Sequence, residues 1–189
     1  MLPETALADV ASYRPRDADD ATLLQHYLSQ ITEHGPASLD RSRSEHLTAS
    51  AFVLDDDLTR TLLCYHRKGD FWVQPGGHLD ETDESLHSAA LRELGEETGI
   101  TRFVAQSQRP ADIDRHALGD GFGACSWHLD VGFIVIADPT ELTTLSDESL
   151  QLAWWPLDAL PDGVAPGFGR RIANIALAAA AQLGEDHNA

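Results

Sequence analysis

Three carboxylates near the middle of the chain are grouped closely enough to bind a metal ion. Glu93, Glu96 and Glu97 follow one another at offsets of three and four residues, which places them on one face of a helix. They also lie near the end of that helix, where the macrodipole disfavours negative charge. A hard divalent cation such as Mg²⁺ would offset this repulsion, because it takes oxygen ligands. Acidic helix faces are usually only solvated, so the surrounding sequence has to decide.

The residues on either side of these glutamates form a longer pattern. The pair Gly76-Gly77 reads as a turn after a strand-like segment, and an acidic loop follows it. A helix is expected from Leu86 onward, with apolar residues at three- and four-residue spacing, and Gly99 supplies its stop. The stretch 76–100, GGHLDETDESLHSAALRELGEETGI, resembles the Nudix hydrolase signature: a glycine, a spaced glutamate, then Arg-Glu-aliphatic-x-Glu-Glu-x-Gly-aliphatic.

The resemblance implies a role for most residues of this stretch. Glu93, Glu96 and Glu97 would hold Mg²⁺ or Mn²⁺, and the backbone carbonyl of Gly76 would contribute to the same site. Arg92 would orient the carboxylates by pairing with one of them; a solvated surface arginine is the alternative. The implied activity is metal-dependent hydrolysis of a diphosphate linkage, in a nucleoside diphosphate joined to another group.

The acidic loop departs from the family pattern by one residue. Six residues separate Gly77 from Glu84, where the family has five, and seven separate Glu84 from Arg92. Either the loop has one insertion and Glu84 keeps the catalytic role of the family's loop glutamate, or Asp83 replaces it. We favour the first, with Asp83 as the helix cap and Glu84 in the first turn. An insertion within the helix would rotate its face by about 100°.

The general base has two candidates. Glu93 is the first, because a motif glutamate takes this role in some members of the family that the chain resembles. The second is the acid pair Asp147 and Glu148, in the loop before a strand-like segment at 152–155, a region that supplies the base in other members. Two acids in a solvated turn is the simpler interpretation of that loop.

Several residues outside the helix are candidates for substrate binding. His78 directly follows the glycine pair, and Trp72 precedes it and either stacks on a flat group or packs in the core. His128 and Asp130 lie two apart on one face of a strand, and the same spacing recurs in the segment 112–118. These pairs line a pocket or are structural hydrogen-bonded groups. A zinc site is not expected, because CxxC and HxxxH spacings are lacking.

The rest of the chain supplies elements that position the motif. Strands are expected at 46–54, 59–67, 71–73, 103–106, 112–118, 126–137 and 152–155, and helices at 20–34 and 167–183, with a helical turn at 158–160. This order indicates an α/β or α+β sandwich. The resemblance sharpens it to an α-β-α Nudix fold with a mixed β-sheet over residues 45–185. Residues 1–44 would form an N-terminal arm, loosely docked up to residue 15, and a helix packed on the core.

Composition limits the partners. A net charge of −18 in 189 residues argues against nucleic-acid polymers and anionic membranes, and favours a small phosphorylated substrate that enters with metal. Cys64 and Cys125 read as reduced core residues of a cytoplasmic protein, and neither a signal peptide nor a membrane-spanning stretch is evident. The helix at 20–34 is a weaker candidate for a homodimer contact.

A non-catalytic ligand-binding or regulatory domain of the same fold is the alternative function. Such a domain has no need to keep Arg92, Glu93, Glu96 and Glu97 together, and all four are present. The sequence therefore favours an enzyme.

Overall fold

The computed structural model describes residues 3–118, 125–141, 143–144 and 149–186. Its helices are α1 (Pro3–Ala11), α2 (Ala18–His34), the short 3-10 helix η1 (Gly35–Leu39), α3 (Leu86–Thr98) and α4 (Phe168–Asp186). Its strands are β1 (Glu45–Leu54), β2 (Arg60–His66), β3 (Phe71–Val73), β4 (Gly76–His78), β5 (Ala105–Gln106), β6 (Asp112–Ala117), β7 (Trp127–Ile136) and β8 (Ser149–Pro156). The α+β class expected from the sequence is confirmed.

The chain forms two compact units. Unit 1 comprises Met1–Ser50, Gly76–Glu93 and Gln108–Phe133, and unit 2 comprises Ala51–Pro75, Leu94–Ser107 and Ile134–Ala189. By these ranges, β1, β7 and α3 each contribute residues to both units.

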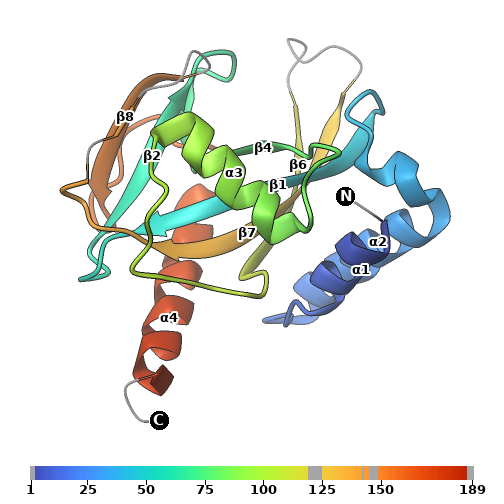
Figure 1. Ribbon diagram of the computed structural model, residues 1–189, viewed down its shortest axis with the longest axis horizontal. Coiled ribbons are helices and arrows are strands. Elements are labelled where there is room, and N and C mark those ends of the chain that lie inside the picture. Colours follow the sequence, from blue (N-terminus) through green and yellow to red (C-terminus); the bar gives the residue numbers. More distant parts are fainter. Residues whose placement is uncertain (1–2, 119–124, 142, 145–148, 187–189) are drawn as a thin grey trace. The chain divides into compact units, whose positions relative to one another are not determined.

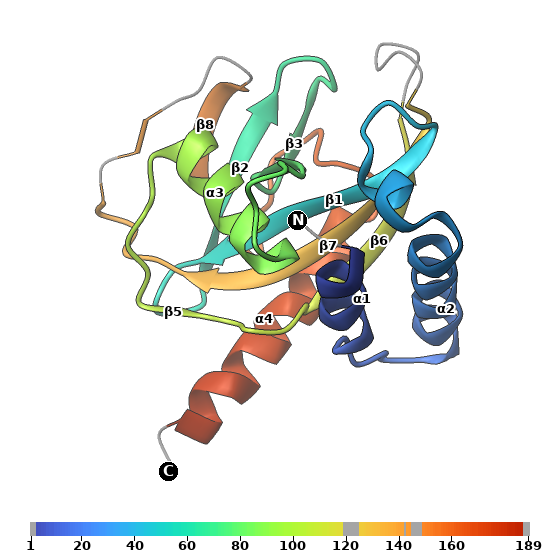
Figure 2. The same cartoon turned by 45° about the vertical axis from the view of Figure 1, so that its right-hand side comes forward.

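Unit 1 contains helices α1 and α2, which lie side by side (Figures 1 and 2). Its strand pairs are antiparallel: β4 pairs with β1, and β6 pairs with β7. The glycine pair is therefore part of a strand, and the turn expected there is wrong. A Cβ atom on Gly76 would lie 2.5 Å from the Cβ of Ser50, so glycine is what allows β4 to approach β1 this closely.

The N-terminal segment is an ordered helix, so the loosely docked arm expected up to residue 15 is wrong. Ala6 and Val10 of α1 are fully buried. The carboxylate of Asp9 accepts a hydrogen bond from the backbone N–H of Leu86 at 2.8 Å, at the N-terminus of α3. Burial raises the pKa of Asp9. Helix α1 therefore supports the first turn of the motif helix.

Helix α2 begins as the sequence indicates, with an acidic cap. Asp17 accepts a hydrogen bond from the backbone N–H of Asp20 at 2.9 Å. On the buried face of the helix, the Tyr27 hydroxyl lies 2.9 Å from the backbone oxygen of Asp114 and 2.8 Å from that of Asp130. Tyr27 therefore ties α2 to β6 and β7.

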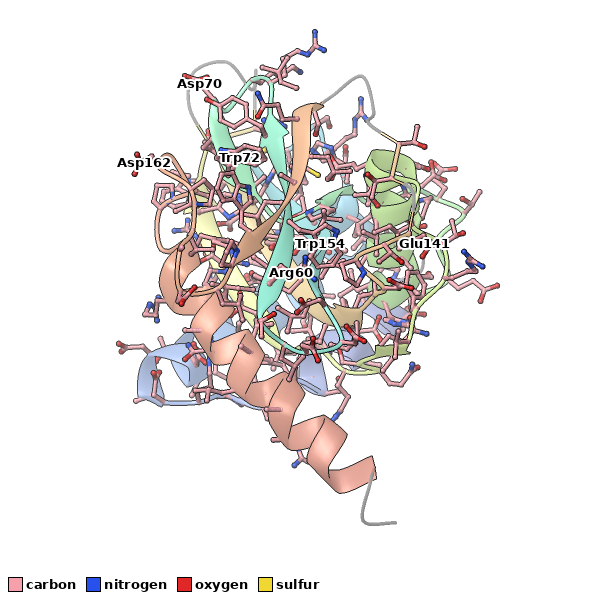
Figure 3. The ribbon with its side chains drawn as sticks, turned by 90° about the vertical axis from the view of Figure 1, so that its left-hand side faces the viewer. Arg60, Asp70, Trp72, Glu141, Trp154 and Asp162 are labelled. Carbon is pink, nitrogen blue, oxygen red and sulfur yellow. The ribbon has the colours of Figure 1, made fainter. Side chains whose placement is uncertain are left out.

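Unit 2 is built on strand β2, which pairs antiparallel with β3 and with β8. Figure 3, viewed with β2 and β8 toward the reader, labels Arg60 on β2 and Trp154 on β8. The rings of Trp72 and Trp155 pack edge to face at 5.4 Å, and the Phe168 ring of α4 stacks on Phe52 at 6.1 Å. The helical turn expected at 158–160 does not form; a short turn follows β8 instead.

No helix within the described ranges combines the length and the apolar character that crossing a membrane requires.

Candidate active site

Helix α3 begins with a cap formed by two serines. The backbone N–H of Ser88 donates to Ser85 Oγ at 3.0 Å, and Ser88 Oγ accepts from the N–H groups of Ser85 and Glu84 at 2.9 and 3.1 Å. This reciprocal pairing is a capping box. The prediction that Asp83 caps the helix and Glu84 opens its first turn is therefore wrong. The spacing Ser85-x-x-Ser88 carried the correct signal, and Gly99 (φ +78°) ends the helix as expected.

Asp83 is the loop carboxylate that the motif arginine holds. Its two oxygens accept from Arg92 Nε and Nη2, each at 2.9 Å, and Oδ2 also accepts from the backbone N–H of Asp80 at 2.7 Å. Asp83 is 6% exposed, whereas Glu84 is exposed on the loop. A bidentate pair of this kind is geometrically specific. The structure thus brings Asp83, and not Glu84, into the motif network.

Arg92 makes two further contacts that join the helix to the sheet. Its Nη1 donates to Glu93 Oε1 at 2.9 Å, and its Nη2 donates to the backbone oxygen of His78 at 2.9 Å. The hydrogen bonds to Asp83 raise the pKa of Arg92, with Glu93 adding to the shift, so the guanidinium is charged at any physiological pH. The expected pairing of Arg92 with a motif glutamate is observed, and the solvated-arginine interpretation is wrong.

Glu93 lies directly against the backbone of β4. A Cβ atom on Gly77 would lie 2.7 Å from Glu93 Oε2 and 2.8 Å from its carboxyl carbon. Any other residue at position 77 would therefore displace the carboxylate. A fixed carboxylate beside a glycine backbone is the kind of oxygen-rich surrounding that suits Mg²⁺ or Mn²⁺, and the residues fit such an ion.

The other two motif glutamates occupy the last turns of α3. Glu96 is exposed, whereas Glu97 is only 7% exposed. The Sγ atom of Cys64 lies 3.8 Å from Glu97 Oε2, and burial together with the charge of Glu97 raises the pKa of this thiol. Because α3 is a continuous helix from Leu86 to Thr98, the offsets from Glu93 keep the three carboxylates on one helical face.

Asp130 has the contacts of a structural hydrogen-bonding group. It is 4% exposed, and its carboxylate accepts from Thr48 Oγ1 at 3.2 Å and from Ser50 Oγ at 2.8 Å. On the neighbouring strand, Asp114 lies opposite Asp130 and His116 lies opposite His128. The two polar pairs singled out in the sequence therefore share one face of β6 and β7.

The remaining candidate residues are Trp72, which packs in unit 2, and the acid pair Asp147 and Glu148. Trp72 belongs to unit 2, is 7% exposed and packs on the rings of Tyr65 and Trp155, which is the arrangement of a core residue. Its role in stacking on a substrate stays a prediction. Asp147 and Glu148, the second candidates for the general base, lie outside the described residues.

The structure also assembles a histidine cluster that the sequence did not reveal. The rings of His46, His78 and His128 lie with centroids 5.0 to 5.3 Å apart. Their nitrogen atoms lie within 4.8 Å of one another, close enough to share a metal ion. They come from β1, β4 and β7, so spacing rules for short metal motifs, on which a zinc site was not expected, do not apply to them.

The fold and the motif helix define a family. The protein-family model that describes the NUDIX domain matches residues 44–174 of the sequence. The chain therefore belongs to the Nudix family. Among curated proteins, the chain is similar to the m7GpppN-mRNA hydrolase NUDT17 of Danio rerio, at 37% identity over 84 residues. The match covers 44% of this chain and about a quarter of the length of that relative (25%).

Solved structures with the same fold share little sequence with the chain. One is the NUDIX domain of Shewanella oneidensis NrtR with ADP ribose, at 20% identity and a TM-score of 0.56 over 78% of this chain and 94% of that one. Another is a C. elegans Ap4A hydrolase complex, at 18% identity and a TM-score of 0.55 over 71% of this chain and 98% of that one. At such identities the likeness shows the fold alone.

Proposed function

We propose that the protein is a metal-dependent hydrolase that cleaves the diphosphate linkage of a nucleoside diphosphate joined to another group. The observation that carries this proposal is the network in which Arg92 fixes Glu93 against Gly77, at the start of a helical face that also bears Glu96 and Glu97. The similar proteins act on or bind compounds of this kind by name: a capped mRNA, Ap4A and ADP ribose.

Each residue of the network has a distinct part in this proposal. Glu93, Glu96, Glu97 and the backbone carbonyl of Gly76 would hold Mg²⁺ or Mn²⁺. Such an ion, when bound, neutralises charge on phosphate oxygens and acidifies a water molecule. Arg92 is a positioning residue, because it holds Asp83, Glu93 and the backbone oxygen of His78 in place. Asp83 fixes Arg92, and so takes the place in the network that the sequence pattern indicated for Glu84.

The general base is proposed to be Glu93, with Glu148 as the second candidate. The hydrogen bond from Arg92 Nη1 to Glu93 Oε1, at 2.9 Å, orients this carboxylate. The variants Glu93→Gln and Glu148→Gln separate the two: loss of the base removes the acidic limb of the pH–rate profile, whereas loss of a metal ligand raises the metal concentration needed for half-maximal rate.

The cellular location and the substrate class proposed for the protein follow from its cysteines and its net charge. Both Cys64 and Cys125 are free, and Cys64 is buried, which suits a reducing cytoplasm. A net charge of −18 favours small phosphorylated substrates brought in with a cation. We propose residues 45–185 as the catalytic domain, in line with the family match to 44–174.

A hydrolysis panel tests the activity. Untagged protein would be incubated with nucleotide sugars, dinucleoside polyphosphates, ADP-ribose, NADH, nucleoside triphosphates and a cap analogue, with Mg²⁺, with Mn²⁺ or with chelator, and the products identified by mass spectrometry. We expect one substrate class to be cleaved at a phosphoanhydride bond with metal and not with chelator. Tight binding of a panel compound without turnover would favour a ligand-binding domain instead.

A further inference from the structure

Unit 1 contains a second group of potential metal ligands. These are histidines and not carboxylates, so their ligand atoms are nitrogens. The sheet fixes the three histidines. His46 and Thr48 lie two apart on β1 and so share a face, and Thr48 lies directly opposite His78 of β4. His128 lies on β7, with its ring 5.0 Å from that of His46 and 5.3 Å from that of His78. Three strands thus bring their imidazole rings together.

The type of ligand selects the type of ion. Imidazole nitrogen suits zinc, copper, nickel and iron, whereas Mg²⁺ takes oxygen ligands. The group of three consists of histidines alone, with ligand atoms within 4.8 Å of one another. Its donors therefore point to a divalent transition-metal ion, a different class from the ion proposed for α3.

The geometry is close to that of a bound ion. Nitrogen ligands about 2.1 Å from a tetrahedral metal lie roughly 3.4 Å from each other. From separations within 4.8 Å, small rotations of the rings close the remaining gap, and His78 and His128 are only partly buried and so have room to turn. His46, at 1% exposure, is the fixed member.

The contacts of His46 bear on which of its ring nitrogens carries the proton. Its Nδ1 lies 3.3 Å from the backbone oxygen of Arg43, and a carbonyl oxygen can only accept. That contact assigns the proton to Nδ1 and leaves the lone pair on Nε2, as in metal-binding histidines whose second nitrogen donates to a carbonyl. The Cys125 Sγ atom lies 3.5 Å from His46 Nδ1 and 3.9 Å from its Nε2, so a thiol stands beside the group.

Neither ring packing nor anion binding accounts for the cluster as well as a metal ion does. Rings can pack for stability alone, but packing does not require that nitrogen atoms from three separate strands lie within 4.8 Å of one another. A site for a phosphate anion would need protonated rings, and the burial of His46 opposes its charged form.

We propose that His46, His78 and His128 bind one divalent transition-metal ion of the zinc class, in addition to the ion held by the carboxylates of α3. Its function would be to join β1, β4 and β7 next to the Arg92 network, because the backbone oxygen of His78 accepts a hydrogen bond from Arg92.

Zinc and cobalt titrations test this proposal. Untagged protein is freed of metal and then titrated with Zn²⁺ against a chromogenic chelator, and separately with Co²⁺ followed by visible absorption. Excess Mg²⁺ keeps the carboxylates of α3 occupied in both titrations. His78→Asn and His128→Asn are compared with His34→Asn, a histidine in the last turn of α2 that lies outside the group. The buried His46 is left unchanged, and circular dichroism with chelator checks that each variant is folded.

We expect the wild type and His34→Asn to bind one Zn²⁺ per chain. His78→Asn and His128→Asn should each weaken binding by at least about a hundredfold and lose the cobalt absorption, since loss of even an outer-shell partner costs 10- to 100-fold. Glu97→Gln should bind Zn²⁺ as the wild type does, which separates this site from the one proposed on α3. Folded His78→Asn and His128→Asn proteins with unchanged zinc affinity, or a wild type that binds no zinc, would overturn the proposal.

Discussion

Two arginines in unit 1 hold carboxylates with the same fork geometry in different surroundings. Arg16 donates to both oxygens of Asp20, through Nε at 2.6 Å and Nη2 at 3.2 Å, and to Asp112 Oδ1 at 3.1 Å. Tyr13 adds a hydrogen bond to Asp20 at 2.7 Å. The Asp112 side chain is completely buried. This network ties the N-terminal helices to β6.

The Arg92 network contains the same bidentate aspartate but ends differently. Its second carboxylate belongs to Glu93, which lies against the backbone of Gly77 and is 15% exposed, whereas Asp112 is completely buried. The difference teaches that a bidentate arginine–aspartate pair can stabilise the fold alone and does not by itself indicate an active site. In the proposed function, what distinguishes the Arg92 network is the additional carboxylate, Glu93, that it holds against a glycine backbone. Substitutions in the two networks test this contrast.

The largest effect is expected for Glu97→Gln. Removing one anionic ligand weakens metal binding and neutralisation of phosphate charge, and should lower turnover by about a hundredfold or more. Because Glu97 is 7% exposed and a buried charge is costly, the thermal midpoint in chelator should not fall. Steady-state kinetics and thermal denaturation measure both. Glu33→Gln, an exposed glutamate of α2, is the control, and normal turnover by Glu97→Gln at saturating Mg²⁺ would remove Glu97 from the site.

Replacing each arginine in turn separates chemistry from folding. Arg92→Ala should destabilise the protein, since it strands the buried Asp83, and should also cut turnover of the folded fraction by about 10- to 100-fold, the usual cost of losing an orienting partner. Arg16→Ala should destabilise to a similar extent, because Asp20 and Asp112 are buried, but leave turnover per folded molecule unchanged. Equal losses of turnover in the two variants would show that the Arg92 network is only structural.

Of the two neighbouring loop acids, Asp83 should affect turnover and stability more than Glu84 does. Asp83→Asn weakens the bidentate contact with Arg92, and we expect about a tenfold loss of turnover together with reduced stability. Glu84→Gln, its matched neighbour, changes an exposed side chain and should alter neither property measurably. The pair is compared by kinetics and urea denaturation. A stable, fully active Asp83→Asn beside an inactive Glu84→Gln would restore the arrangement favoured from the sequence.

The smallest effect concerns the pH dependence of the Arg16 network. Burial raises the pKa of Asp20, but hydrogen bonds from Arg16 and Tyr13 lower it more, so the net pKa lies below the ordinary 3.8. A carboxyl with a lowered folded-state pKa contributes stability that is present above the unfolded pKa and lost as pH falls through the folded one. The unfolding free energy of Arg16→Ala should therefore depend less steeply on pH below about 4 than that of the wild type. Identical slopes would mean that Arg16 does not stabilise the charged form of Asp20.

What could be predicted from the sequence was local. The offsets among Glu93, Glu96 and Glu97 lie within one helix, and helical geometry alone places them on a common face. The strands at 46–54 and 126–137 contain the apolar runs AFVL and VGFIVIA, which indicated a buried strand in each. The Nudix fold followed from the motif and is confirmed by the family match.

What could not be predicted depends on tertiary contacts. Helix α1 buries only Ala6 and Val10, too few apolar positions to show a period. The glycine pair has turn chemistry, and only its neighbour β1 makes it a strand. The histidine cluster combines residues 46, 78 and 128, which strand pairing brings together across the chain. The capping box at Ser85 and Ser88 was visible in the sequence but was outweighed by the acids before it.

The most direct test of the central claim is a titration with Mn²⁺ in which bound metal and turnover are measured on the same sample. Electron paramagnetic resonance reports free Mn²⁺, and product release reports the rate for the best substrate of the panel. We predict that turnover is absent in metal-free protein and rises in proportion to bound Mn²⁺, with both curves shifted to higher concentration in Glu97→Gln. Full turnover before any Mn²⁺ is bound, in protein shown to be metal-free, would contradict the assignment of the α3 carboxylates as a metal-dependent hydrolytic site.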